Sequence, residues 1–304
     1  MKPENFDPGL TTQYSGTLRR AINRDGSFNV HRRGTHLRDV NLYLKLIDTT
    51  WPRFLAVVTT AFLLINMVFA GLYLVTGIEH LQGIEPEMGR VLNAFFFSIH
   101  TLTTVGYGNI FPRGTTTNLI AAIEATTGLM VFAVASGLLY GRFSRPTARI
   151  AFSDHMLVAP YQDGTSLQFR ITNARSNVLM DLEARVLLMT VDPVDGQLRR
   201  DFFDLPLERR RVYFFPLTWT IVHPIDSASP LFGKTAADLA KTSAEILILI
   251  EGFDDTFSQT VHARYSYRYD EIVWGAKFQP AFSVDPHGDL VVDVSRIDEL
   301  KVVS

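Results

Sequence analysis

The strongest constraint on this chain is a long run at residues 54–76 that carries no charge. The run, FLAVVTTAFLLINMVFAGLYLVT, contains no Asp, Glu, Lys, Arg or His. As a helix it would be about 35 Å long, enough to cross a hydrocarbon core of about 30 Å. Asn66 and three threonines do not form the polar stripe of a buried soluble helix. We therefore predict a transmembrane helix, which lies too far along the chain to be a signal peptide.

A second apolar run, at residues 119–139, contains one charged residue, Glu124. It is rich in Ala, Gly, Thr and Ser, the small residues that let membrane helices approach closely. We expect a second transmembrane helix that faces protein or a water-filled cavity, while the first faces lipid. Charged residues make up 20% of the chain, below the roughly 25% of soluble domains, which agrees with this assignment.

Basic residues precede the first run and follow the second, and few lie between the two runs. Those before it include Arg19, Arg20, Arg24, Arg32, Arg33, Arg38, Lys45 and Arg53, and those after the second are Arg142, Arg145 and Arg149. The connection between the runs opens with Glu79, Glu85 and Glu87. The positive-inside rule therefore predicts a multi-pass protein with both termini in the cytoplasm.

The stretch at residues 36–50 has the pattern of an amphipathic helix. Leu37, Val40 and Ile47 are among the apolar residues spaced by three and four positions. Trp51 and Pro52 follow directly. We expect an interfacial slide helix over residues 36–52 that bends into the membrane, with an ordinary juxtamembrane linker as the alternative.

The pattern changes after residue 146. Short alternating runs and dense apolar runs are separated by turn signals at residues 163–164, 195–196 and 287–288. This predicts an all-β sandwich of about 150 residues, with one short helix or turn at residues 234–243. The expected parts are a loosely ordered N-terminal cytoplasmic segment (1–35), the slide helix (36–52), a transmembrane domain (53–145) and the cytoplasmic sandwich (146–304).

The segment between the two transmembrane runs contains an aromatic apolar stretch at residues 91–102, which is too short to cross a membrane. The sequence TTVGYG follows it, and the chain then returns to the second run. Non-helical backbone at membrane depth occurs only where protein encloses it or where it lines water. We therefore predict a re-entrant helix and loop.

The loop contains TVGYG, which resembles the selectivity-filter sequence of potassium channels. Its glycines can adopt dihedral angles that let successive carbonyls point the same way. The filter would consist of Thr104, Val105, Gly106, Tyr107 and Gly108, whose oxygens would form rings that replace the hydration shell of potassium ions. Val105 and Tyr107 would point back toward the short helix. One chain supplies a quarter of each ring, which requires a homotetramer.

The order of slide helix, span, short helix with filter, span and β-rich domain resembles the prokaryotic inward-rectifier potassium channels. The resemblance covers about residues 37–285. It rests on the blocks AFFFSIH (94–100), GRFSRP (141–146), AFS (151–153), PLTWTIVHPIDSASPL (216–231), LILIEGF (247–253) and DEIVWG (270–275). It implies an immunoglobulin-like cytoplasmic sandwich, passive potassium conduction and a location in the bacterial inner membrane.

The resemblance assigns roles along the second span. Gly128 matches a residue at which the inner helix can bend, although close helix packing explains a glycine equally well. Tyr140 matches a bulky gate residue at the inner-helix crossing, with simple packing as the alternative. Phe132, grouped with this gate, stands where strong rectifiers carry an acid, so strong block by magnesium or polyamines is not expected.

The resemblance also points to residues that support the filter. Glu124 is ionisable within a span and is expected to hydrogen-bond behind the filter. Eukaryotic relatives often brace the filter with an acid and an arginine, but the corresponding residues here are His100 and Ile110. That salt bridge cannot form, and His100 is expected to be a neutral hydrogen-bonding residue that supports the filter, with a pH-sensing role as the alternative.

Two charged groups are assigned by the same resemblance. Anionic lipids, such as phosphoinositides, would bind basic residues near the inner membrane surface, namely Arg53, Arg142, Arg145 and Arg149; a topology signal is the simpler explanation. Glu251 and Asp255 would line the cytoplasmic pore and concentrate cations, unless they belong to a solvated turn. Barium, magnesium and polyamines are the expected blocking cations.

Other classes of protein fit the sequence less well. The net charge of −2 argues against a nucleic-acid binder, and the absence of Cys excludes thiolate nucleophiles and zinc fingers. Gly233, Lys234 and Thr235 lack the first glycine of a phosphate loop, which would stand five residues before Gly233, because position 228 is Ala. We therefore expect neither an enzyme nor a metal cofactor. A tethered receptor and a weakly selective or ligand-gated cation channel of the same architecture remain as alternatives.

Overall fold

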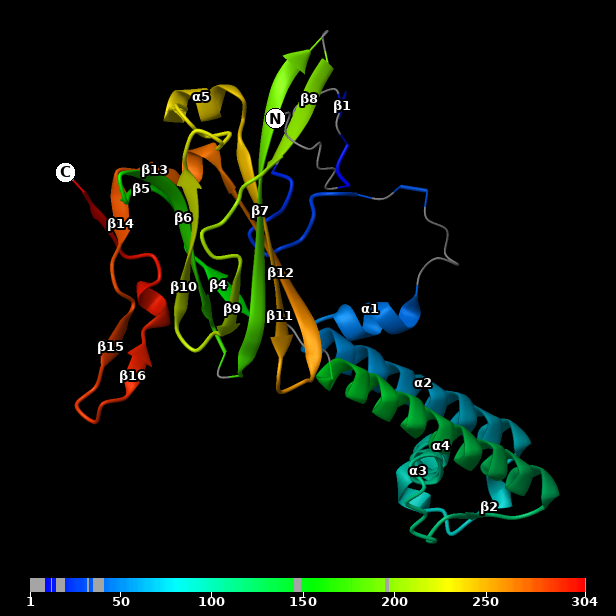
Figure 1. Ribbon diagram of the computed structural model, residues 1–304. Coiled ribbons are helices and arrows are strands. Elements are labelled where there is room, and N and C mark those ends of the chain that lie inside the picture. The colour runs from blue at the N-terminus through cyan, green and yellow to red at the C-terminus, as the bar shows by residue number, and fades with distance from the viewer. Residues whose placement is uncertain are drawn as a thin grey trace. The chain divides into compact units, whose positions relative to one another are not determined.

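A computed structural model of the chain describes residues 9–11, 13–14, 20–31, 33–34, 41–144, 149–175, 177–194 and 197–303. The chain forms two compact units (Figure 1). The helical unit comprises Arg33–Arg145, and the β unit comprises Met1–Arg32 together with Pro146–Ser304. The N-terminal segment thus groups with the sandwich, whereas the sequence suggested a separate part at residues 1–35.

Four helices make up the described part of the helical unit: α1 (Leu42–Asp48), α2 (Trp51–Thr76), α3 (Gly89–Leu102) and α4 (Thr115–Phe143). Short 3₁₀ turns, η2 (Ile78–His80) and η3 (Pro86–Met88), and the small pair β2 (Leu81–Gln82) and β3 (Phe111–Pro112) connect them. Helices α2 and α4 are both long and apolar enough to span a membrane. The two expected spans are therefore present, and each is longer than predicted.

The start of α2 corrects the predicted slide helix. Helix α1 ends at Asp48, Thr50 is extended, and Trp51 and Pro52 form the first turn of α2. Pro is well suited to a first helical turn, because its fixed φ is helical and its missing N–H is not needed there. The predicted helix therefore breaks before Trp51, and residues 36–40 lie outside the described part.

The apolar core of the helical unit lies where α2, α3 and α4 meet, and Figure 1 shows α2 and α4 side by side with α3 near one end. Phe69 and Tyr73 of α2 and Ala94 and Phe97 of α3 are buried in it. Many apolar side chains on the outer faces of α2 and α4 are exposed in the single chain, among them Leu64, Val68, Leu119, Leu129 and Val134. Such faces fit a lipid environment or further protein.

The β unit is a two-sheet sandwich, as predicted. One sheet has the order β1-β8-β7-β11-β12, with β9 beside β7, and the other has the order β10-β6-β5-β13, with β4 beside β6. The strands of the first sheet are β1 (Gln13–Tyr14), β7 (Leu179–Val194), β8 (Gln197–Asp204), β9 (Arg211–Phe214), β11 (Glu245–Asp254) and β12 (Gln259–Arg268). Those of the second are β4 (Ile150–Phe152), β5 (Met156–Tyr161), β6 (Gly164–Asn173), β10 (Thr218–Ile225) and β13 (Ile272–Trp274).

The core of the sandwich is built from every second side chain of its strands, because successive side chains of a strand point to opposite faces of the sheet. Alternate residues, such as Phe169 and Ile171 of β6 and Ile246, Ile248 and Ile250 of β11, are almost fully buried in one cluster. The expected short helix is α5 (Ala236–Lys241). Two small antiparallel pairs follow β13: β14 (Ala276–Phe278) with β17 (Leu300–Val302), and β15 (Phe282–Val284) with β16 (Leu290–Val292). The predicted turn at 195–196 lies outside the described residues.

The described part of the N-terminal segment packs on the sandwich, and the expectation that it is loosely ordered was wrong there. Strand β1 pairs with β8, and Ile22 is buried. The backbone N–H of Ala21 donates to the carboxylate of the buried Glu245 at 3.0 Å, and Arg20 pairs with Glu271 at 2.7 Å. The local sequence does not reveal this because both carboxylates lie far away in the chain.

Candidate functional site

The loop after α3 has an alternating backbone. Thr104, Gly106 and Gly108 have positive φ angles of 59°, 52° and 81°, whereas Val105 and Tyr107 do not. An alternation of left-handed and ordinary dihedral angles turns successive carbonyls to the same side of the chain, in contrast to the alternation of a strand. A backbone of this kind can present a row of oxygens, and the role of TVGYG as the filter stays a prediction.

Thr104 has a backbone conformation that the sequence argument expected only of the glycines in this loop. The sequence argument placed the unusual dihedral angles on glycines, but the alternation begins at Thr104, a β-branched residue with φ 59°. This conformation costs roughly 1–2 kcal/mol for a residue with a Cβ. The loop is held at its start by the Thr104 N–H, which donates to Thr101 at 3.0 Å, and the Gly106 N–H, which donates to His100 at 3.1 Å. The strain thus lies in a loop that the end of α3 holds in place.

The side chains of the loop lie partly against α3. The rings of Tyr107 and His100 meet edge to face with centroids 4.8 Å apart, so Tyr107 does turn back toward the short helix. His100 makes this ring contact and no side-chain hydrogen bond within the described part of the chain. Tyr107 remains 74% exposed and Val105 53% exposed in the single chain. Both side chains are therefore available to a neighbouring subunit.

A buried polar network lies behind the loop and joins the three long helices of the helical unit. Glu124 of α4 is fully buried and accepts a hydrogen bond from the hydroxyl of Tyr73 on α2 at 2.6 Å. It also accepts one from the hydroxyl of Ser98 on α3. The Ser98 hydroxyl is in addition 3.1 Å from the side-chain oxygen of Asn66. Glu124 thus hydrogen-bonds within the protein, and its support of the filter stays a prediction.

The sequence argument missed the partners of Glu124. Tyr73, Ser98 and Asn66 are all fully buried, and they come from α2 and α3. The signal that could have found them is the presence of polar side chains in otherwise apolar membrane segments, since such groups need a partner there.

Gly128 lies at the closest contact between α4 and α3. A Cβ atom at this position would be only 1.9 Å from the carbonyl oxygen of Leu102. Helix α4 runs without a break from Thr115 to Phe143. Close packing, the alternative left open by the sequence, is therefore observed in this structure.

The residues assigned to the gate are exposed in the single chain. Phe132 and Tyr140 of α4 each have 74% of their surface accessible. Bulky side chains that are exposed on a membrane helix must face lipid, a neighbouring subunit or a central cavity.

Arg142 has a structural role that the sequence did not predict. Its Nη1 donates to the carbonyls of Leu46 at 2.6 Å and Ile47 at 2.9 Å, and its Nη2 donates to that of Thr49 at 2.8 Å. The guanidinium also lies 4.6 Å from the ring centroid of Trp51. Arg142 therefore caps the C-terminal end of α1, where a cation is favoured by the helix dipole.

The other basic residues assigned to lipid differ in their surroundings. Arg53 of α2 and Arg149 of the β unit are exposed, and Arg145 lies outside the described residues. Arg53 and Arg149 form no ion pair within the described part of the chain. These two residues are therefore free to meet an external anion, whereas most donors of Arg142 are in use.

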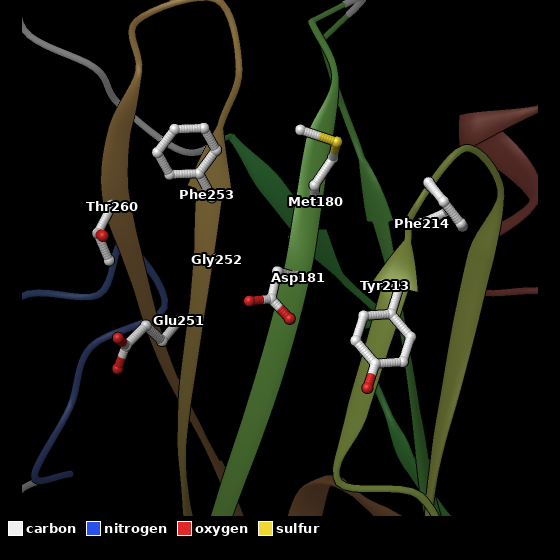
Figure 2. A pocket seen from close by; sticks show the side chains of 8 residues that line it. All are labelled: Met180, Asp181, Tyr213, Phe214, Glu251, Gly252, Phe253 and Thr260. Atoms are coloured by element: carbon white, nitrogen blue, oxygen red, sulfur yellow. The ribbon is translucent and has the colours of Figure 1, made fainter.

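The acidic residues assigned to the cytoplasmic pore lie at one end of the first sheet. Glu251 of β11 is half-buried, and its carboxylate lies 3.7 Å from Nε2 of His262. It lines a hollow of about 460 Å³ with Asp181 of β7 and Tyr213 of β9 (Figure 2). Asp255 lies in the following turn, where its backbone N–H donates to Val178 at 3.2 Å. Two carboxylates, of Glu251 and Asp181, thus border this hollow.

A resident metal site is not evident in the described residues. No group of three or more His, Asp or Glu side chains among them is arranged to hold a metal ion.

Comparisons with known proteins agree with the two units. The family model described as "inward rectifier potassium channel C-terminal domain" matches residues 150–304, and the one described as "ion channel" matches residues 54–144. A relative in Paramagnetospirillum magnetotacticum, inward rectifier potassium channel Kirbac3.1, is 36% identical over 284 residues, covering 92% of this chain and 95% of that protein.

Mammalian relatives are more distant. ATP-sensitive inward rectifier potassium channel 12 of Mus musculus is 28% identical, covering 79% of this chain and 61% of that protein. Inward rectifier potassium channel 18 of Homo sapiens is 28% identical, covering 79% of this chain and 60% of that protein. Among solved structures, Spo0M of Bacillus subtilis aligns with a TM-score of only 0.23 at 10% identity, over 45% of this chain and 59% of that one. The two family matches and the bacterial relative show that this chain belongs to the inward rectifier potassium channel family.

Proposed function

We propose that four copies of this chain form a passive potassium channel. The observation that carries the proposal is the alternating backbone of the loop at Thr104, Gly106 and Gly108. Four such loops around an axis would stack rings of carbonyl oxygens that replace the hydration shell of potassium ions, which are the cargo. The weakly selective channel is not favoured, because the chain carries the whole TVGYG sequence in the family context.

The gate is proposed at the cytoplasmic end of α4. Four copies of Tyr140, with Phe132 deeper in the cavity, would narrow the pore by steric closure and dewetting. A bend at Gly128 would open it, and such a bend requires Gly128 to separate from the carbonyl of Leu102. The absence of an acid at position 132 leaves block by magnesium or polyamines weak, whereas barium would block the filter itself.

Anionic lipid and the cytoplasmic domain would bias this gate. Arg53 and Arg149 are exposed and suited to anionic headgroups, including phosphoinositides. Arg145 belongs to the same group, and Arg142 would act indirectly by holding α1 on α4. Glu251 and Asp255, repeated in four subunits, would concentrate cations in the cytoplasmic pore.

We place the channel in a bacterial inner membrane with both termini in the cytoplasm. The basic residues before α2 and after α4, and the scarcity of such residues between them, support this orientation.

The decisive experiment is uptake of radioactive rubidium by liposomes that contain the purified chain. Uptake that barium blocks, and that potassium but not sodium competes, is expected. The variant Gly106→Ala should lose this uptake, because its φ of 52° is unfavourable for a residue with a Cβ. Gly233→Ala, whose φ is 68° in a loop of the β unit, is the matched control and should retain uptake. Equal competition by sodium, or a dimeric protein in solution, would contradict the proposal.

A further inference from the structure

The connection between α2 and α3, residues 77–88, lies against the segment that follows the filter loop, residues 109–113. Strand β2 of the connection pairs with strand β3 of that segment. The N–H of Arg113 also donates to the carbonyl of His80 at 2.7 Å. Backbone hydrogen bonds therefore join the far end of the filter loop to a stretch that has no part in the function proposed above.

Gly83 makes the closest approach between the connection and this segment. Its φ is +78°, and a Cβ at this position would lie 1.8 Å from the carbonyl oxygen of Asn109, the residue directly after Gly108. A backbone carbonyl cannot turn aside as the end of a flexible side chain does, so a residue with a Cβ does not fit here unless the two segments separate. The absence of a side chain at Gly83 thus sets how closely Asn109 packs on the connection.

The connection is itself held in place, so it can serve as a support. Asn93 of α3 is 1% exposed, and its side-chain oxygen accepts a hydrogen bond from the Glu85 N–H at 2.8 Å. Its side-chain nitrogen donates to the carbonyls of Glu85 at 2.7 Å and Gly89 at 2.8 Å. Leu81 of the connection is buried in the apolar core of the helical unit. The segment after the filter loop therefore rests on a fixed part of the fold.

Ion pairs do not hold the filter loop within the described part of the chain. No residue from 104 to 113 belongs to one, and Ile110 is apolar and buried. The start of the loop is fixed by the end of α3, since the carbonyls of His100 and Thr101 accept hydrogen bonds from loop N–H groups. The far end is fixed by a different element, the connection, through backbone hydrogen bonds and the close contact at Gly83.

We propose that Gly83 is a positioning residue for the far end of the filter. By letting Asn109 pack directly on the connection, it fixes where the neighbouring carbonyl of Gly108 lies. In a filter of this kind carbonyl oxygens replace the hydration shell of the ion, so their placement affects which ion is accepted. The inference rests on the function proposed above and deepens it, because it assigns part of the discrimination between potassium and sodium to a residue outside the filter.

Rubidium uptake by liposomes that contain the full chain tests this role, with potassium and sodium as competitors. In Gly83→Ala the ratio of the half-inhibiting concentrations of sodium and potassium should fall roughly tenfold, which corresponds to about 1.4 kcal/mol of lost discrimination. Gly89→Ala is the matched control, because its φ of +77° is nearly that of Gly83 but no atom lies within 4 Å of a Cβ there. This control should keep the ratio of the parent.

Hydrogen exchange of residues 109–113 is a second readout, and it does not depend on conduction. Their amides, among them the Arg113 N–H, should exchange faster in Gly83→Ala than in the parent or in the control, because the added Cβ separates the two segments. Asn93→Ala frees the connection from α3 and should change uptake and exchange in the same direction. It takes the place of Gly83→Ala if size-exclusion chromatography shows that the latter does not assemble.

The inference is overturned if the assembled variant keeps either the competition ratio or the exchange of the parent. It is also overturned if Gly89→Ala lowers the ratio as much as Gly83→Ala does. A parent chain that takes up no rubidium, or whose uptake sodium and potassium inhibit equally, would contradict the proposed function instead. The exchange of residues 109–113 then decides by itself whether Gly83 holds the segment.

Discussion

Gly128 of α4 lies directly against the carbonyl oxygen of Leu102, the last residue of α3, and a Cβ at this position would be 1.9 Å from that oxygen. The contact places the inner helix on the residue from which the filter loop departs. Movement of α4 at this point would disturb the end of α3, because a backbone carbonyl cannot move aside as a flexible side chain does.

We expect Gly128→Ala to push α4 away from α3 and to reduce both tetramer stability and rubidium uptake. Overpacking of a tight contact costs about 1–3 kcal/mol. Gly71→Ala on α2 is the control, since no atom lies within 4 Å of a Cβ there. The measurement is the temperature at which the assembly dissociates, together with uptake by liposomes. Unchanged values in Gly128→Ala would show that the contact opens freely.

Removal of one donor to the buried carboxylate of Glu124 should destabilise the helical unit. In Tyr73→Phe the carboxylate loses a hydrogen bond of 2.6 Å, and an unsatisfied buried group costs about 1–3 kcal/mol. Thermal dissociation should occur at lower temperature than in the parent. Thr126→Ala, which removes a hydroxyl from the exposed side of α4, is the control. Equal effects of the two substitutions would contradict a special role of the network.

Arg142 should hold α1 on α4 through the planar shape of its guanidinium group as well as through its charge. In Arg142→Lys a single ammonium replaces a planar group that reaches three carbonyls and packs on Trp51, so α1 should become less protected. Hydrogen exchange of the amides of Leu42–Asp48 is the readout. Arg53→Lys is the control, because Arg53 is exposed. If the amides of α1 exchange at equal rates in both variants, Arg142 is not the residue that holds α1 on α4.

The ion pairs of Glu271 with Arg20 and Arg24, which join the N-terminal segment to the sandwich, should weaken in acid. Burial alone raises the pKa of Glu271, but the Arg268 N–H and the guanidinium groups of Arg24 and Arg20 outweigh it, so the pKa lies below its ordinary value. A lowered pKa means that the folded state prefers the ionised form. The stabilisation is therefore complete above about pH 4.3, the pKa in an unfolded chain, and is lost as the pH falls through the lower folded value.

Glu271→Gln tests whether the charge of Glu271 holds the N-terminal segment on the sandwich. At pH 7 the variant should release the N-terminal segment more readily than the parent, which limited proteolysis of the segment measures. The difference between them should shrink below about pH 4.3, because the parent then loses its charge as well. Glu299→Gln, in an exposed pair with Arg296 at 2.8 Å, is the control. A difference that does not change with pH would rule out the charge of Glu271 as its cause.

The positions of the main elements were predictable because they follow from local patterns. The uncharged runs that became α2 and α4 are long enough to span a membrane whatever surrounds them. The alternation in strands such as β6 and β11 marks a half-buried sheet before any partner strand is known. Element ends were less accurate: Trp51 and Pro52 were assigned to the slide helix, although they begin α2.

The partners of the polar residues were not predictable in the same way. Glu124 was singled out from its charge in an apolar run, but Tyr73 and Ser98 could not be, because each lies on a different helix. Arg142 likewise looks like a lipid contact in the sequence, because it is a basic residue at the end of a membrane helix. Only the position of α1 shows that it caps a helix.

The amino-acid sequence by itself determined the two membrane helices, the filter loop between them and the β-rich domain, since hydropathy, periodicity and the TVGYG motif are local properties. Tertiary structure alone decided which buried groups satisfy one another, that the described part of the N-terminal segment lies on the sandwich, and that Gly128 lies against the carbonyl of Leu102. The physical reason is that a polar or tightly packed group is stable only with a partner, and folding brings that partner from a distant part of the chain.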